Sequence, residues 1–294
     1  MAATEQLILN DMPKPLRAVT PAKLSTFDRC PRRFRYQYLD RPTPVRTGAW
    51  AHTGIGAAIH NALKGLWDLP AERRTPEAAR SLLSTGWPEH GFRDDRQRAN
   101  ALRVATDQLA AYVEGMDLQV QPRGIERTVG APYDSLAISG RVDRVDERFD
   151  EQRSPHLVVV DYKTGRAIPT EDEARSSLQL ALYTVAVRRT FRARAYRVEL
   201  HHIPTGTVAS WEYTEQTLDR QLRRASDTAD DIENAAAKVA SGTDRDTAYP
   251  AHTGTWCGFC DFRPSCPEGQ GAGPARDPWF AVTDQPAAAV DTMS

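Results

Sequence analysis

The chain has 294 residues, of which 40% are hydrophobic and 26% are charged, and its formal net charge is -1. This length and composition are those of an ordinary soluble globular protein with one large domain or two small ones, and a balanced charge argues neither for nor against a polyanionic partner. No apolar stretch approaches the roughly 18 residues of a membrane span, and residues 1–15 lack the order of a signal peptide. We therefore expect a cytoplasmic protein with no membrane partner.

The N-terminal half of the sequence predicts helices. Residues 1–20 show no clear period, and we expect a flexible segment there. The next helix is expected to begin with Ser25 as its N-cap and to contain Cys30. Apolar residues at helical spacing predict a helix over 54–67 within a helical region that extends to 120, and the further helices expected in this region cover 78–83 and 96–116.

The C-terminal half alternates between strand and helix patterns. The predicted strands cover 125–129, 136–145, 157–161 and 197–203, and the predicted helices cover 178–187 and 218–239. Residues 269–294 are rich in Gly, Pro and Ala, so we expect a second flexible segment. The pattern as a whole predicts a single α/β domain over 21–268, with a central mixed sheet flanked by helices.

A basic and aromatic cluster lies near the N-terminus. It consists of Arg29, Arg32, Arg33, Arg35, Arg41 and Arg46, interleaved with Phe34, Tyr36 and Tyr38. Arginine pairs with phosphates and aromatic rings stack on bases, so Arg32, Arg33 and Arg35 are candidate nucleic-acid contacts. The alternative is an amphipathic helix whose aromatic rings face the core and whose arginines face solvent, and both interpretations can hold together.

The segment from Leu157 to Gly165 carries the strongest chemical signal. Its β-branched apolar start and its Gly turn predict a buried strand that ends in Asp161-Tyr162-Lys163. Because side chains alternate along a strand, Asp161 and Lys163 project into one site, with Tyr162 opposite. A carboxylate suits Mg²⁺ or Mn²⁺, and a lysine can position a water or offset phosphate charge. Taken alone, the motif is explained as well by an ion pair at a strand end.

The four cysteines follow a spacing typical of metal ligands. Cys30 stands apart, and Cys257, Cys260 and Cys266 form a C-x2-C-x5-C run. Four thiolates can hold a structural zinc ion or an iron-sulfur cluster, and a C-x2-C pair in a cytosolic protein favours metal over disulfide. The residues alone leave zinc, iron-sulfur and free cysteines open. Any of the metals would join the two ends of the chain.

These motifs, in this order, resemble the PD-(D/E)XK nucleases of the RecB type. The elements that carry the resemblance are a helical His60, Asp143 in Gly140-Arg141-Val142-Asp143, Asp161-Tyr162-Lys163, and Gln179-x3-Tyr183. The cysteine spacing resembles the iron-sulfur branch, which includes AddB-like nucleases and CRISPR-associated RecB-like exonucleases. The resemblance spans about residues 24 to 268. It implies a restriction-endonuclease-like core, with a helical insertion after the first helix and a cysteine-ligated cluster joining the chain ends.

The resemblance also implies roles for individual residues. It implies that His60, Asp143, Asp161 and the backbone carbonyl of Tyr162 ligate Mg²⁺ or Mn²⁺, and that Lys163 is the catalytic lysine. Glu126 matches a further acid near such sites. Gln179 and Tyr183 match a helix that contacts DNA or orders the site. The same resemblance favours a 4Fe-4S cluster over zinc on Cys30, Cys257, Cys260 and Cys266.

The implied function is a metal-dependent DNA exonuclease of the RecB family, acting in repair or recombination on single-stranded DNA or on free ends. The alternatives are a non-catalytic DNA-binding or assembly subunit that keeps the nuclease fold, and a CRISPR-adaptation nuclease. No G-x4-G-K-[ST] loop is present, so any helicase would be a separate partner.

Overall fold

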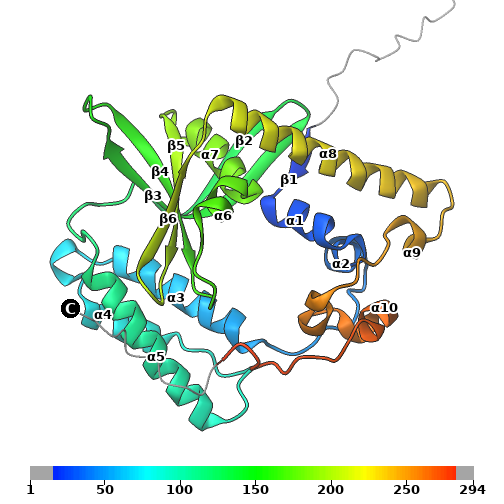
Figure 1. The fold of residues 1–294 in the computed structure, drawn as a ribbon, viewed down its shortest axis with the longest axis horizontal. Coiled ribbons are helices and arrows are strands. Elements are labelled where there is room, and N and C mark those ends of the chain that lie inside the picture. The colour runs from blue at the N-terminus through cyan, green and yellow to red at the C-terminus, as the bar shows by residue number, and fades with distance from the viewer. Residues whose placement is uncertain (1–15, 283–294) are drawn as a thin grey trace, which may run out of the picture.

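A six-stranded mixed sheet lies at the centre of the computed structural model, which describes residues 16–282 (Figure 1). Its strands are β1 (Arg17–Val19), β2 (Gly124–Tyr133), β3 (Leu136–Phe149), β4 (Pro155–Lys163), β5 (Ala195–His202) and β6 (Thr207–Glu212). The order is β1-β3-β4-β5-β6, and β2 pairs with β3. The pairs β1/β3 and β4/β5 are parallel and the others are antiparallel, which confirms the predicted mixed sheet.

Helices cover both faces of this sheet. Helices α7 (Leu178–Phe191) and α8 (Glu215–Ala240) pack on one face, and α3 (Ala51–Trp67), α4 (Pro76–Thr85) and α5 (Asp95–Glu114) pack on the other. Leu157 and Val159 of β4 pack on the α7 face, whereas Val158 and Val160 pack against α3 and α5. Because both faces are covered, this strand is apolar without alternation. In the described part of the chain, no helix has the length and apolarity needed to cross a membrane.

Several short elements differ from the sequence-based expectations. Thr20 rather than Ser25 caps α1 (Pro21–Arg29), and its Oγ1 accepts a hydrogen bond of 3.2 Å from the amide of Lys23. Cys30 lies between α1 and α2 (Pro31–Phe34) in an extended conformation, not inside a helix, because a proline disfavours helical conformation in the residue before it. The strands β1 and β6 and helix α6 (Glu171–Ser176) were not predicted, since their short sequences show no period. The predicted flexible ends over 1–15 and 283–294 lie outside the described residues.

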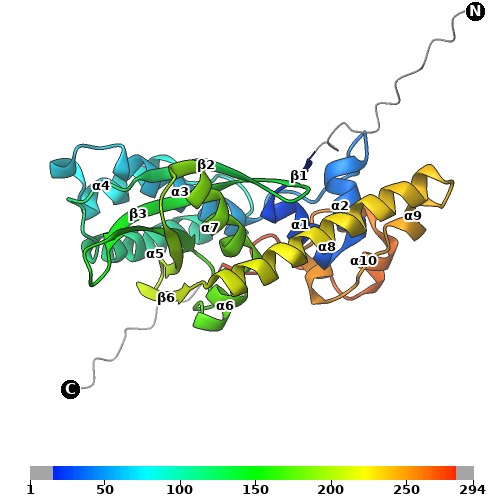
Figure 2. The same cartoon turned by 90° about the horizontal axis from the view of Figure 1, so that it is seen from above.

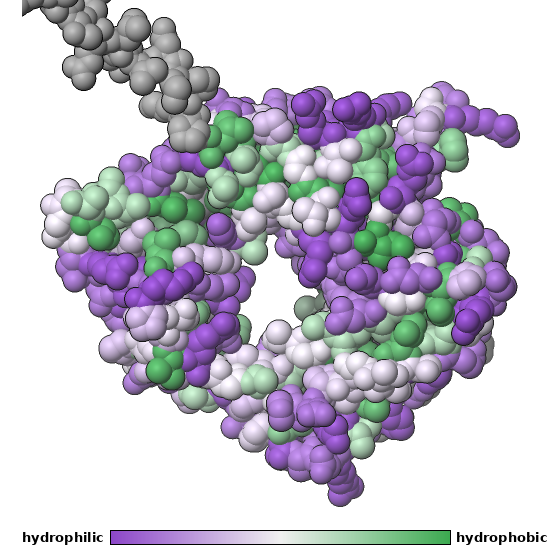
Figure 3. All heavy atoms as spheres, turned by 180° about the vertical axis from the view of Figure 1, so that it is seen from behind, coloured by the Kyte–Doolittle hydropathy of each residue, from purple (hydrophilic) through white to green (hydrophobic). Residues whose placement is uncertain are grey.

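The molecule is elongated, and α8 runs from the sheet at one end to a second group of elements at the other (Figure 2). That group contains α1, α2, α9 (Arg245–Ala248), α10 (Pro267–Gly271) and the cysteine segment 257–266. Figure 3 shows an opening that passes through the molecule between the two ends. The end of β4 and helix α6 lie along one side of this opening, and α1 and α2 lie along the other (Figure 1).

The ring around the opening is closed by contacts that cross between the two ends. Below the opening in Figure 1, the segment that leads into α3 lies on the cysteine segment, because Trp50 Nε1 donates to Asp261 at 2.8 Å and Thr47 N donates to the Asp261 carbonyl at 2.7 Å. Phe280 stacks on Phe259 and contacts Trp50 edge to face. The described part of the predicted tail is therefore packed against the domain.

Strand β3 has a break along one edge of its ladder. Its residues 136–138 pair with β1 and its residues 144–149 pair with β4, while β2 pairs with 136–145. A strand has two edges, so β1 and β4 must share the edge opposite to β2. Among residues 16–282, no strand pairs with the intervening residues 139–143 on that edge.

The side chains of Asp143 and Tyr183 lie against the backbone at this break. The Asp143 carboxylate accepts a hydrogen bond of 2.8 Å from the Tyr162 amide. Burial raises the pKa of the Tyr183 hydroxyl, and the nearby backbone of Arg141 opposes this effect. The Tyr183 ring lies over Gly140, where an added Cβ would sit 2.4 Å from a ring carbon. The Asp143 side chain thus supplies an acceptor to a backbone N–H at the break, as backbone groups require.

We predict that Gly140→Ala displaces the Tyr183 ring and destabilises the fold by about 1–3 kcal/mol, as overpacking does in other proteins. Chemical denaturation monitored by circular dichroism measures this change. Gly48→Ala is the matched control, because a Cβ at Gly48 meets nothing within 4 Å. Equal stability of the two variants would show that Tyr183 does not pack over this strand.

Candidate active site at the break in the strand ladder

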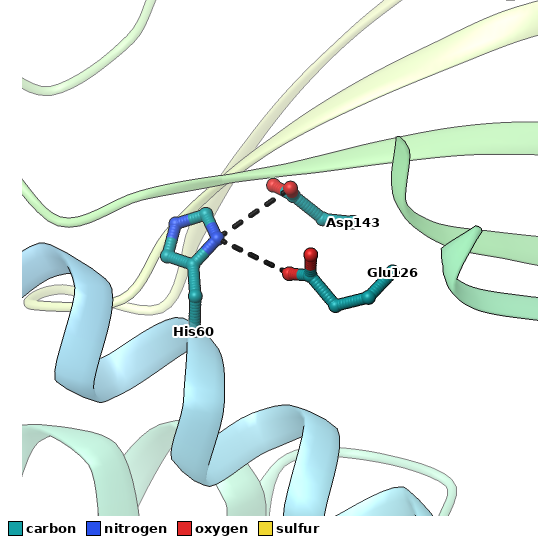
Figure 4. A group of neighbouring side chains, drawn as sticks. All are labelled: His60, Glu126 and Asp143. Carbon is teal, nitrogen blue, oxygen red and sulfur yellow. Dashed lines mark ion pairs between the residues drawn. The ribbon is translucent and has the colours of Figure 1, made fainter. Parts of the chain in front are cut away.

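Three side chains converge at the break in a group that could hold a metal ion (Figure 4). His60 comes from α3, Glu126 from β2 and Asp143 from β3, and one ligand atom of each lies within 4.8 Å of the others. His60 Nδ1 is 3.4 Å from Asp143 Oδ1 and 3.8 Å from Glu126 Oε1. An imidazole with two carboxylates is a donor set that suits a divalent metal.

The backbone of Glu126 is in an unusual conformation. The register of the β2/β3 ladder places Glu126 opposite Asp143, between the pairs Ile125/Arg144 and Arg127/Val142. Its φ is 45°, a left-handed value that costs a non-glycine residue about 1–3 kcal/mol and that clusters at functional sites. The carboxylate is directed toward His60 (Figure 4). The fold therefore tolerates strain at a residue whose side chain reaches the candidate metal group.

Arg141, which was not predicted as a site residue, also contacts this group. Its Nε lies 2.9 Å from Glu126 Oε2, and its side chain is 70% exposed. The signal was its position inside the Gly-Arg-Val-Asp motif, two residues before Asp143. A mostly exposed guanidinium beside an acidic group is available to a phosphate as well as to Glu126.

Two carboxylates, those of Asp143 and Glu126, lie beside the single imidazole of His60. Burial lowers the pKa of His60, but contacts with Asp143 and Glu126 outweigh that effect and raise the pKa to about 10. A protonated imidazole is thus held by two acids that are themselves mostly buried. The same negative charge favours a dication at this point.

Asp161 and Lys163 lie side by side at the end of β4, as alternation along a strand predicts. Lys163 Nζ is 2.9 Å from Asp161 Oδ2, and Gln179 Nε2 donates to Asp161 Oδ1 at 2.8 Å. Burial raises the pKa of the Asp161 carboxyl, and the charge of Asp161 raises the pKa of Lys163 against the opposing effect of burial. The Lys163 side chain remains about one third exposed and accessible to a ligand.

Tyr162 faces the opposite side of the sheet from Asp161. Its ring packs edge to face on His60, and its hydroxyl accepts a hydrogen bond of 3.1 Å from buried Arg144. Its amide donates to Asp143. The contact of Tyr162 with the site is therefore through its N–H, and the carbonyl implied as a ligand makes no described contact with the group.

The structure thus arranges the predicted site residues in two adjoining sets. His60, Asp143 and Glu126 form the candidate metal group, and Asp161 with Lys163 and Gln179 forms a hydrogen-bonded set beside it. The charge of Asp161 acts on His60 across the site. Glu126, which the resemblance placed near the site, is a closer neighbour of His60 and Asp143 than the sequence indicated.

The predicted DNA contacts Arg32 and Arg35 do not fit this arrangement. Both are buried, at 3% and 6% exposure. Arg32 donates to the carbonyls of Tyr249 and Asp246, and Arg35 pairs with Asp40 and Asp246. These bonds hold both buried side chains against the segment around α9, away from the candidate site. Arg33 is partly exposed and lies 3.9 Å from Asp261.

All four cysteines line one small cavity between α2 and the cysteine segment, and all are free. Backbone amides point at two of the sulfurs, because Arg33 N lies 3.5 Å from Cys30 Sγ and Gly269 N lies 3.3 Å from Cys266 Sγ. Burial raises the pKa of Cys260 and of Cys266. Within residues 16–282, the metal-compatible grouping at 4.8 Å is that of His60, Glu126 and Asp143, so no three cysteine sulfurs approach one another this closely.

Comparisons with known proteins address the family. A candidate exonuclease from Eubacterium rectale is similar in structure at 12% identity and a TM-score of 0.46, with 78% of this chain and 83% of that chain covered. The structure of SSO0001 is similar at 16% identity and a TM-score of 0.36, with 87% and 89% covered. No curated protein matches the sequence. The family model of the PD-(D/E)XK nuclease superfamily matches residues 18–267. The chain, with its His-Glu-Asp group and Asp-x-Lys motif at a break in a mixed sheet, therefore belongs to the PD-(D/E)XK nuclease superfamily.

Proposed function

We propose that this protein is a metal-dependent deoxyribonuclease that degrades single-stranded DNA from a free end, in repair or recombination. The observation that carries the proposal is the convergence of His60, Glu126 and Asp143 beside the Asp161–Lys163 pair. This set contains oxygen and nitrogen ligands for a hard divalent ion and, next to them, a cation for the phosphate. The assignment to the RecB type rests on the resemblance of its motifs.

The ligand chemistry supports Mg²⁺ or Mn²⁺ as the ion, held by His60, Glu126 and Asp143, with Asp161 and the Tyr162 carbonyl as further ligands. When bound, such an ion supplies a Lewis acid and lowers the pKa of a coordinated water. Two mostly buried carboxylates lie beside the imidazole, and a dication there would take the place of the imidazole proton and be held by one nitrogen and two carboxylates, so the donor set fits a dication.

Lys163 is the residue best placed to act on the phosphate. Asp161 fixes its ammonium group by an ion pair, and Gln179 in turn fixes Asp161. An ammonium group held in this way can orient the attacking water and offset the negative charge that develops on the phosphate. Arg141, with most of its side chain exposed, is a second cation for the same phosphate or its neighbour.

The ring shape supports a substrate with a free end. The opening in Figure 3 is bordered by the end of β4 and α6, next to the candidate site. The ring is closed by contacts of the segment 45–50 and of Phe280 with the cysteine segment. A strand can enter a closed ring only by its end.

The four-cysteine cavity supports a 4Fe-4S cluster on Cys30, Cys257, Cys260 and Cys266. A single zinc ion with bonds of about 2.3 Å holds its four sulfurs about 3.8 Å apart. No three of these sulfurs lie within 4.8 Å of one another among the described residues, whereas a cluster whose irons each bind one thiolate spaces them more widely. The cluster would hold the far side of the ring together.

Removal of a site residue tests the nuclease proposal. We expect Lys163→Ala to lower Mg²⁺- or Mn²⁺-dependent cleavage of labelled single-stranded DNA by about a hundredfold or more, because a fixed charge opposite the phosphate is lost.

We expect Asp143→Asn to abolish cleavage and to remove the rise in melting temperature that Mn²⁺ gives the parent protein. Lys238→Ala, on the exposed end of α8, is the control. Full activity in Asp143→Asn would refute the assignment of the metal site, and absence of cleavage by the parent protein would favour the non-catalytic DNA-binding subunit.

The ring predicts that covalently closed single-stranded circles resist cleavage, whereas the same circles are degraded after one cut makes them linear. Gel analysis of both forms, incubated with Mg²⁺ or Mn²⁺, measures the difference. Cleavage of circles at the rate of linear molecules would show that the strand does not pass through the opening.

Metal analysis tests the cluster. The purified protein should be brown and contain about four irons per chain, and Cys266→Ser should lose iron and melt at a lower temperature. Zinc without iron in protein purified under anaerobic conditions would contradict the assignment.

A further inference from the structure

A polar groove adjoins the candidate site. It has a volume of about 610 Å³ and is formed by the end of α1, the α6–α7 junction, α8 and the residues just before Cys257. Gln179 lies at one end of it and donates to Asp161. The groove therefore connects directly with the residues beside the candidate metal group.

The opposite wall of the groove carries an indole ring that is fixed in place. Trp256 Nε1 donates to the carbonyl of His252 at 3.1 Å. The ring lies so close to Gly254 that an added Cβ would be 2.4 Å from a ring carbon. Trp256 is only partly buried, although it is held from one side by Gly254 and precedes the buried Cys257. A rigid, partly exposed aromatic face is a stacking platform for a base.

A free cation lies in the same groove. Arg29, in the last turn of α1, is exposed, and its side chain has no ion pair or hydrogen bond within residues 16–282. The acid in the groove, Asp28, is already paired, because it lies 3.2 Å from Arg224 Nη2 and accepts from Thr228 Oγ1 at 2.8 Å. Arg29 is thus the cation available to a phosphate in this groove.

We propose that this groove binds the single-stranded DNA that adjoins the cleaved phosphate, with a base stacked on Trp256 and a phosphate paired with Arg29. This inference rests on the proposed function, since it places the substrate of the same site. It also gives the cysteine segment a role in binding, because that segment positions Trp256. The sequence-based assignment of DNA contacts to Arg32 and Arg35 is replaced by Arg29, their neighbour on α1.

Binding and cleavage are measured separately to test this inference. A short fluorescein-labelled oligo(dT) is titrated, by anisotropy, with full-length protein that carries Lys163→Ala, so that cleavage does not consume the probe. We expect Trp256→Ala to weaken binding from about fivefold to more than a hundredfold, the range for the loss of one base-stacking ring, and Trp256→Phe to retain most of the affinity.

The salt dependence separates the two contacts. Removal of one phosphate contact to a single strand lowers the slope of log affinity against log salt by about 0.7. We expect Arg29→Ala to show this change and Trp256→Ala to leave the slope unaltered. Arg220→Ala, an exposed arginine of α8 outside the groove, should change neither the affinity nor the slope.

The outcomes distinguish the groove from the nuclease. If the parent protein binds oligo(dT) and cleaves DNA while Trp256→Ala and Arg29→Ala bind as tightly as the control, DNA binding in the groove is refuted and the proposed nuclease activity is supported. If both variants bind more weakly but the protein with Lys163 intact cleaves no DNA, DNA binding in the groove is supported and the proposed nuclease activity is refuted. Tighter binding of oligo(U) than of oligo(dT) overturns the assignment to DNA, and circular dichroism confirms that each variant is folded.

Discussion

The break in the ladder on one edge of β3 is the constraint on which the candidate site depends. Strands β1 and β4 occupy the two ends of this edge, and in the described part of the chain residues 139–143 between them pair only with β2. Backbone groups left without a strand partner need other partners. The carboxylate of Asp143 supplies one of them by accepting from the Tyr162 amide, so a residue that completes the sheet is also a residue of the site.

The break also allows side chains from both faces of the sheet to meet. His60 belongs to α3 on one face, and Gln179 belongs to α7 on the other. An unbroken ladder would separate them, whereas here Asp143 contacts His60 while its neighbour Asp161 is held by Gln179 and Lys163. The resulting concentration of buried carboxylates raises the pKa of His60 and favours a dication. Asp143 thus takes part both in completing the sheet, through the Tyr162 amide, and in the candidate metal group, through His60.

Sequence patterns predicted the parts of the protein that depend on local order. The apolar run before Asp161 predicted β4, and alternation predicted that Asp161 and Lys163 lie together. The positions of other residues depend on long-range contacts that no period records. The burial of Arg32 follows from partners more than 200 positions away, around Tyr249 and Asp246. The close approach of Glu126 to His60 likewise requires the pairing of β2 with β3, and the ring requires contacts between the two ends of the chain.

The central claim is that His60, Glu126 and Asp143 bind one divalent metal at the break in the sheet. Anomalous diffraction from crystals soaked in Mn²⁺ tests it most directly, because the manganese position is located without reference to activity. We predict a peak with His60 nitrogen and the oxygens of Glu126 and Asp143 within about 2.0–2.3 Å, typical bond lengths for such ions. A manganese ion bound elsewhere, with these three side chains still paired to one another, would contradict it.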